Sequence, residues 1–416
     1  MFPTMTVASL EDVSLPRLTE ALRRMGPAFV LAAATLGPGT ITIYSLSGSL
    51  FGYQLLWVFV LAGVFAVVYV EMLARFGIVS DRTLWEAIRE KFGPVAAVLG
   101  GVFGGATAIG FQTGNVVGVG LGLSVLTGVD SVVWGTVMAA AAIGFIWVRD
   151  LYERLETLVF TLILAMIAGF VGTLAITGFS VSGATAGLVP SFPSEQAVFI
   201  TLVMMATYFS LYGVVYQAYL VKEKGYDRED LGAATFDAIA AMVVLGLLGA
   251  IILLTSAAVL KPQGIVVDSA AAMARQLRPL AGDGATVLFG VGLFAASFSS
   301  LVANALIGGV LLADGLDYSA AFDGLPVKVI ATGVTAVGWI TGIAPQLFGA
   351  DPVDTIVLAQ AFSVVGLPYF GLVALLLLND SAYVGRFTNT RARNVLAAIG
   401  YVVTLAIALN FLRSLL

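Results

Sequence analysis

AATLGPGTIT, residues 33–42, interrupts a hydrophobic segment that is long enough to cross a bilayer. Glycine and proline in this stretch break a helix, and threonine adds a polar side chain. In lipid, a broken backbone is tolerated only where protein or a polar cavity satisfies the freed N–H and C=O groups. Discontinuous helices of this kind hold the substrate of many transporters near the membrane midplane. The stretch therefore predicts a binding site at Gly37, Pro38, Gly39 and Thr40.

The composition of the whole chain is that of a membrane protein. Of its 416 residues, 59% are hydrophobic and 11% are charged, whereas a soluble domain carries roughly 25% charged residues. The chain has no cysteine and no histidine, which excludes disulfides, thiolate metal sites and imidazole ligands. The first 25 residues are polar and include no cleavable signal peptide. We find no catalytic motif, nucleotide-binding loop or nucleic-acid patch, so we expect neither an enzyme nor a nucleic-acid-binding protein.

Apolar runs of about 20 residues, the length that a spanning helix needs, recur along the chain. Glycine and proline separate them, as expected of connections. The runs cover residues 26–49, 53–78, 95–127, 131–148, 155–178, 196–221, 231–260, 282–313, 326–345, 352–378 and 394–414. We therefore predict an all-α integral membrane protein with eleven transmembrane helices, referred to below as helix 1 to helix 11.

A second polar interruption lies in helix 6. Residues 206–213 read ATYFSLYG, and they contribute Thr207, Ser210 and Tyr212 as candidate binding residues. Paired interruptions in the first and sixth helices indicate two five-helix repeats of inverted topology. The predicted division is a cytoplasmic segment at 1–25, a first repeat at 26–178, an extracellular loop at 179–195, a second repeat at 196–378, and a loop with helix 11 at 379–416.

The positions of Lys and Arg predict the orientation in the membrane. Of the 20 such residues, only Lys261, Arg275, Arg278 and Arg413 fall on one side. Cytoplasmic connections carry the excess of positive charge, so we place the N-terminus in the cytoplasm and the C-terminus outside a plasma membrane. The oligomeric state is left open.

From about residue 26 to residue 395 the chain resembles the Nramp family of divalent-metal transporters, within the larger group that shares the LeuT-type fold. The resemblance rests on six segments. They are GPAF at 26–29, FGYQLLWV at 51–58, EMLARFGIVS at 71–80, Ser299-Ser300, Gln360, and GLPY at 366–369. It implies alternating access between two inverted repeats, and it makes Gln360 a candidate substrate ligand.

At the positions where the resemblance implies a metal site, this chain differs. The family's Asp-Pro-Gly-Asn signature reads Gly37-Pro38-Gly39-Thr40 here, so the break is kept and the carboxylate is absent. The helix 6 positions of Ala, Met and Pro-His in the family carry Thr207, Ser210, Leu211 and Tyr212. In helix 3, Gln112 and Asn115 stand where the family's proton route uses acids, and interhelical hydrogen bonding is the alternative role for both.

These differences bear on the substrate. A dication in a neutral cavity faces a large desolvation cost, whereas the N-terminus of the half-helix at Gly39 and Thr40 favours an anion. We therefore expect a secondary transporter of a small anion, such as bicarbonate or a small carboxylate. The helix 1 break and the hydroxyls of helix 6 would hold it.

Two other functions stay open, together with one coupling ion. The first is transport of a divalent cation, Mg²⁺ or Mn²⁺, with Mg²⁺ partly hydrated so that it needs fewer direct ligands. The second is a transport-inactive sensor or partner-binding protein on the same scaffold. Hydroxyls of Ser299 and Ser300 with helix 1 carbonyls could form a Na⁺ site, although close helix packing explains two small residues equally well. We expect no resident metal and no other cofactor.

Overall fold

The computed structural model describes residues 36–414, and it describes only the backbone of residues 149–156, Leu211 and Ser414. All regular elements in this part of the chain are helical, which confirms the predicted all-α class. The predicted segment 1–25 and residues 26–35 of helix 1 lie outside the described residues. The longer helices are α3 (Pro38–Phe51), α4 (Trp57–Val79), α6 (Pro94–Thr127), α7 (Ser131–Trp147), α8 (Arg149–Thr177), α10 (Glu195–Tyr208), α11 (Leu211–Glu223), α12 (Leu231–Val259), α15 (Ala285–Gly315), α16 (Leu325–Leu347), α17 (Pro352–Phe362), α18 (Leu367–Leu378) and α20 (Arg391–Ser414).

Short helices fill the connections. They are α5 (Leu84–Phe92), α9 (Val181–Ala186), α13 (Ala270–Ala274), α14 (Arg278–Ala281) and α19 (Ser381–Val384), with 3₁₀ turns η2 (Lys261–Gln263), η3 (Arg275–Leu277), η4 (Gly282–Gly284), η5 (Ser363–Gly366) and η6 (Gly385–Phe387). Side-chain caps explain where several of them begin. Thr83 and Glu86 form a capping box at the start of α5, and Ser180 caps α9 inside the predicted loop 179–195.

Within the described residues, nine helical stretches are long and apolar enough to cross a membrane, so the chain is an integral membrane protein. Two of the eleven predicted spans fall short of that length. Helix α3 is the described part of helix 1, and α7 has 17 residues. The number eleven therefore stays a prediction.

The described residues depart from continuous helix at three places within the predicted spans. Helix α3 begins at Pro38, and Gly37 before it is extended, with φ −89° and ψ −176°. Helices α10 and α11 are separated at Phe209, whose φ of −85° and ψ of 50° are not helical. The third break, η5 between α17 and α18, was not expected in the run 352–378. Pro368 has no N–H to continue the hydrogen bonding of the preceding turn, which explains it.

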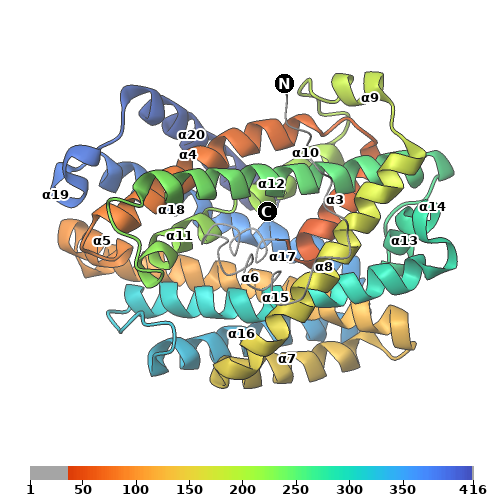
Figure 1. The fold of residues 1–416 in the computed structure, drawn as a ribbon, viewed down its shortest axis with the longest axis horizontal. Coiled ribbons are helices and arrows are strands. Elements are labelled where there is room, and N and C mark those ends of the chain that lie inside the picture. The colour runs from red at the N-terminus through yellow and green to blue at the C-terminus, as the bar shows by residue number, and fades with distance from the viewer. Residues whose placement is uncertain (1–35, 415–416) are drawn as a thin grey trace, which may run out of the picture.

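Helices α6 and α15 form the central pair of the bundle and run side by side across Figure 1. Their backbones touch, because a Cβ on Gly315 would lie 2.5 Å from the Cα of Gly101. Small residues allow such close approach between membrane helices. In the figure, α16 and α7 lie on one side of this pair and α4 and α12 on the other. Helices α3, α11 and α17 lie between the pair and α12.

The long helices run roughly horizontally in Figure 1, so the bundle has two ends. We call the left one, with α5 and α19, the α5 end, and the right one, with α13 and α14, the α13 end. At the α5 end, the ammonium of Lys91 hydrogen-bonds Asp380 and holds the pKa of that carboxyl below its usual range. Glu71 there contacts Arg75 of its own helix at 3.2 Å and Arg393 at 3.3 Å, which joins α4 to α20.

Helix α5 is fixed to the bundle by a buried acid. Asp314, near the end of α15, is 3% exposed. Its Oδ2 accepts hydrogen bonds from the Tyr219 hydroxyl at 2.6 Å and from the backbone N–H of Trp85 at 3.4 Å. Arg89 Nη2 donates to the Asp314 carbonyl at 2.6 Å. One side chain thus connects α5, α11 and α15.

Candidate functional site

The start of α3 is closely packed at its two glycines, and most closely at Gly39. A Cβ on Gly39 would lie 1.8 Å from Nε2 of Gln360. A Cβ on Gly37 would lie 3.0 Å from Oγ of Ser300 and 3.3 Å from Oδ1 of Asn115. Real Cβ atoms do not approach other heavy atoms at 1.8 Å, so the break brings three polar side chains onto bare backbone.

A small cavity of about 20 Å³ lies at this break. That volume holds roughly one water molecule or one ion without a hydration shell. Its lining residues are Gly37, Thr40, Phe111, Asn115, Ser210, Tyr212, Gly213, Asn304, Ile307 and Gln360. The structure thus brings five of the predicted binding residues together, namely Gly37, Thr40, Ser210, Tyr212 and Gln360, and it adds Asn115 from helix 3.

The amide of Asn115 has one orientation, set by a chain of hydrogen bonds. Gln112 is fully buried, and its Nε2 donates to the carbonyl of Leu301 at 2.8 Å and to Oγ1 of Thr335 at 3.0 Å. A carbonyl only accepts, and the Thr335 hydroxyl already donates to the carbonyl of Ala331, so the Gln112 nitrogen must face them. Its Oε1 then accepts from Nδ2 of Asn115 at 3.1 Å. Asn115 is left with its Oδ1 beside Gly37.

The remaining predicted residues, from helices 1 and 6, are not among those that line the cavity. Thr207 donates to Oε1 of Gln360 at 3.5 Å. Pro38 packs on α6, where a Cβ on Gly118 would lie 2.2 Å from the Cβ of Pro38. Gly39 lies under the Gln360 amide. These three residues shape the site without lining it.

Helices α11 and α15 supply the opposite wall. Ser210 is the N-cap residue of α11, yet its side chain makes no capping hydrogen bond. The Tyr212 hydroxyl donates to the carbonyl of Asn304 at 2.9 Å. Sequence reasoning missed Asn304, which lines the cavity with 7% exposure. The sequence feature that could have indicated it is an amide side chain one turn after Ser300 in a very apolar helix.

The two serines proposed for sodium differ in their surroundings. Ser300 is fully buried beside Gly37, and Ser299 is only half-buried. Ser297, three residues before Ser300, is also fully buried and lies 2.7 Å from a Cβ position on Gly118. Ser297 and Ser300 therefore both approach the start of α3 or the helix packed on it. A sodium site at Ser299 and Ser300 stays a prediction.

The cavity is neutral, and helix ends supply its electrostatics. No Asp, Glu, Lys or Arg is among its lining residues, and the described part of the chain holds no cluster of three or more His, Cys, Asp or Glu residues that could bind a metal. The N-terminus of α3 carries a partial positive charge. Helix α10 ends at Tyr208 and lines none of the cavity, whereas α11 contributes Tyr212 and Gly213 from its first turn. The N-terminus of α11 therefore adds further partial positive charge.

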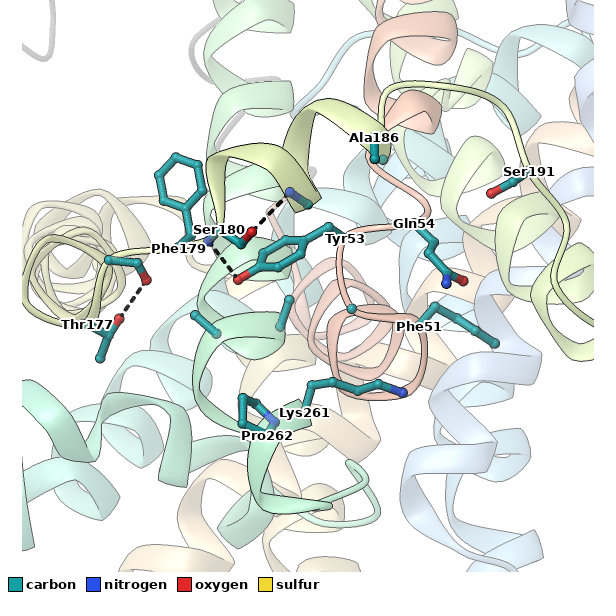
Figure 2. Close-up of a pocket in the computed structure, with 16 residues that line it drawn as sticks. Phe51, Tyr53, Gln54, Thr177, Phe179, Ser180, Ala186, Ser191, Lys261 and Pro262 are labelled. Atoms are coloured by element: carbon teal, nitrogen blue, oxygen red, sulfur yellow. Dashed lines mark hydrogen bonds between the residues drawn. The ribbon is translucent and has the colours of Figure 1, made fainter.

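A much larger cavity, of about 780 Å³, opens near the α13 end, and no residue lines both cavities. Figure 2 shows it between the end of α3, α9 and the start of η2. The hydroxyl of Tyr53 accepts from the backbone N–H of Ser180 at 3.3 Å, and a Cβ on Gly187 would lie 1.9 Å from the Tyr53 carbonyl. Its lysine, Lys261, donates to the carbonyl of Leu50. Helix α9 is thus held on the α3–α4 connection.

Curated relatives and solved structures match nearly the whole chain. The chain is 27% identical over 397 residues to the "divalent metal cation transporter MntH" of Mycobacterium tuberculosis, covering 92% of this chain and 89% of the relative. Its fold matches a crystal structure of the Eremococcus coleocola manganese transporter with a TM-score of 0.79 at 18% identity, over 98% of this chain and 88% of that one. The nucleobase-cation-symport-1 family transporter MHP1 matches with a TM-score of 0.58 at 16% identity, over 94% and 92%. These matches confirm the predicted LeuT-type fold.

The printed names of these relatives overturn one expectation. They are a divalent metal cation transporter and a manganese transporter, so the prediction of a small anion, bicarbonate or a small carboxylate, is wrong. That prediction weighed the positive N-terminus of α3 alone. It left out the oxygen of Asn115, which favours a cation.

A family model also matches almost the whole chain. The family described as natural resistance-associated macrophage protein-like, or Nramp, matches residues 28–414. That range includes both helix breaks, the cavity between them and α20. The chain belongs to the Nramp family.

Proposed function

We propose that this chain carries divalent metal cations across the membrane by alternating access, as a secondary transporter with Mn²⁺ or Mg²⁺ as cargo. The names of its relatives and its membership of the Nramp family support the substrate class. The small cavity at two broken helices supports the location, because discontinuous helices hold ions near the midplane of transporters.

The observation that carries the proposal is the fixed amide of Asn115. Its Nδ2 donates to Gln112, so the amide is turned with its oxygen toward Gly37, on the cavity side. Amide carbonyl oxygens are ligands that Mg²⁺ and Mn²⁺ accept. An anion at the same place would face the lone pairs of that oxygen, which repel it.

The site binds its cargo without a carboxylate. Hydroxyl and amide oxygens from the lining residues Thr40, Asn115, Ser210 and Gln360 replace the hydration shell. Neutral ligands offset less of the dehydration cost than anionic ones do. We therefore expect a high KM, and we expect Asn115→Asp to lower it.

The proposed orientation places the α5 end in the cytoplasm. Arg82, Lys91, Lys222, Arg228 and Arg386 gather there. Lys261, Arg275 and Arg278 belong to η2, η3 and α14, at or near the α13 end. Cytoplasmic loops carry the excess of Lys and Arg, which supports this orientation in a plasma membrane.

Uptake by proteoliposomes tests the substrate class. We expect saturable Mn²⁺ uptake by the wild-type protein, competed by Mg²⁺, and a KM raised about tenfold or more by Asn115→Leu. Gln263→Leu, an exposed amide at the α13 end, serves as the matched control and should change nothing. Wild-type protein that takes up neither ion would refute the proposal.

A double mutant tests the role of the fixed amide itself. Gln112→Leu removes the partner that orients Asn115, so the Asn115 amide turns freely and the KM for Mn²⁺ should rise about tenfold. A carboxylate presents oxygen in either orientation. Asn115→Asp should therefore restore the KM in the Gln112→Leu background. Failure of this rescue, with uptake by the wild type intact, would reject the orienting role of Gln112 and leave the substrate class standing.

A further inference from the structure

A third cavity lies at the α5 end, and none of its lining residues lines the transport site. Its volume is about 650 Å³. Three separate segments enclose it: the end of α4 with the connection to α5, the connection between α11 and α12, and α19 with η6. The lining residues are Val79, Ser80, Asp81, Arg82, Glu90, Arg228, Ser381, Ala382, Tyr383, Val384, Gly385, Arg386 and Phe387.

The charges in this cavity do not cancel. Arg82 forms an ion pair with Glu90, with Nε and Oε1 2.8 Å apart. Arg228 and Arg386 line the same cavity, and neither forms an ion pair with a carboxylate among the described residues. Arg228 uses one nitrogen, Nη2, to donate to the carbonyl of Val79 at 3.2 Å. Arg386 stacks over the ring of Phe387 with its guanidinium carbon 5.1 Å from the ring centre.

The remaining acid of the cavity, Asp81, has a cation beside it. Lys222 donates to the carbonyl of Ser80 at 2.6 Å and lies close enough to Asp81 to interact with it electrostatically. Together, Lys222 and Arg228 also neutralise the carbonyls at the C-terminal end of α4, which would otherwise repel an anion. The cavity is therefore positive in a chain whose net charge is −5.

We propose that this cavity binds a phosphate group through Arg228 and Arg386. A guanidinium presents a planar fork of N–H donors that matches phosphate oxygens. Among the described residues, Arg228 uses only Nη2 in a hydrogen bond. The volume suits a ligand of headgroup or nucleotide size. The cavity lies at the end of the spanning helix α4, where an anionic lipid headgroup and a soluble phosphate can both reach it.

Binding would have a mechanical consequence. Arg228 belongs to the connection between α11 and α12, and Arg386 belongs to η6 before α20. A phosphate held by both would join these two connections to the end of α4, so it should raise the temperature at which the protein unfolds.

The test uses the purified full-length protein and two probes. In the first arm, inorganic pyrophosphate is titrated into detergent-solubilised, metal-free protein by calorimetry. In the second, the unfolding temperature is compared in nanodiscs of phosphatidylcholine alone and with added phosphatidylglycerol. The test variant is Arg228→Gln with Arg386→Gln. The control is Lys224→Gln with Arg391→Gln, which removes the same charge from two exposed positions outside the cavity, one in the α11–α12 connection and one at the start of α20.

We expect the wild-type protein to bind pyrophosphate, to unfold at a higher temperature with phosphatidylglycerol, or both. In the test variant only, the pyrophosphate affinity should fall about tenfold or more, or the lipid-dependent shift in unfolding temperature should disappear. Pyrophosphate binding without lipid would identify a soluble phosphate as the ligand. A response to phosphatidylglycerol alone would identify a headgroup. The proposal fails if neither probe acts on the wild type, or if the control variant loses as much as the test variant.

Discussion

At the level of single residues, the contact between Gly39 and Gln360 is the most demanding in the site. A Cβ on Gly39 would lie 1.8 Å from Nε2 and 2.2 Å from Cδ of Gln360. We expect Gly39→Ala to displace the Gln360 amide, to abolish most Mn²⁺ uptake and to destabilise the protein by about 1–3 kcal/mol, the usual effect of overpacking. Uptake and the unfolding temperature are the measurements.

Truncation of the other partner separates the clash from the loss of a ligand. Gln360→Ala in the Gly39→Ala background removes the atoms that the added methyl group at position 39 would meet. The unfolding temperature should then return toward the wild-type value, while the KM for Mn²⁺ stays high because an oxygen ligand is missing. Recovery of both would show that Gln360 does not touch the cargo.

The sequence was sufficient to find the residues of the break and insufficient to find their chemistry. Gly37, Thr40, Ser210 and Tyr212 could be selected because glycine, proline and hydroxyl residues cluster there within hydrophobic runs, which is typical of a broken helix. Asn115 could not be read as a cation ligand, because its orientation depends on the hydrogen bond from Gln112 to a carbonyl 189 positions away in the chain, which is visible only in three dimensions. The wrong prediction of an anion as substrate arose because this orientation of Asn115 could not be seen in the sequence.

At the level of elements, the docking of α5 rests on Asp314. Asp314→Ala leaves the Tyr219 hydroxyl and the Trp85 N–H without a partner in a buried place, which costs about 1–3 kcal/mol. We expect α5 to detach more often and trypsin to cut faster after Arg82, in the connection before it. Asp317→Ala, which removes an exposed ion pair with Arg89 at 3.1 Å, is the control and should leave the cleavage rate unchanged. Equal rates in both variants would contradict the role of Asp314.

Element boundaries followed from the sequence where a cap or a break was local. The break between α10 and α11 falls inside the predicted ATYFSLYG stretch. The break at η5 was missed, although Gly366 and Pro368 were quoted, because they were read as marks of a resemblance and not as helix breakers. The short helix α9 was missed because its stretch of Ser, Gly and Ala resembles a loop.

At the level of the whole molecule, Glu71 connects the N-terminal half of the bundle to α20. Its carboxylate forms ion pairs with Arg75 and Arg393, and the residue is 7% exposed. We expect Glu71→Gln to cost about 3 kcal/mol, because a buried cation loses its partner. Glu90→Gln breaks the exposed pair with Arg82 and should cost about 0–1 kcal/mol. The two unfolding temperatures, measured in the same detergent, decide the comparison, and similar values would contradict it.

The volume of the cavity at Gly37, about 20 Å³, also bears on speed. Such a space admits an ion without its hydration shell, so the cargo must give up nearly all of its bound water before the protein can change conformation. Mg²⁺ releases water reluctantly. At saturating concentrations, Mn²⁺ should therefore be carried faster than Mg²⁺ even where the two ions have the same KM, and stopped-flow uptake measures both. The protein would then select its cargo by how quickly an ion exchanges water, and not only by how tightly the ion binds.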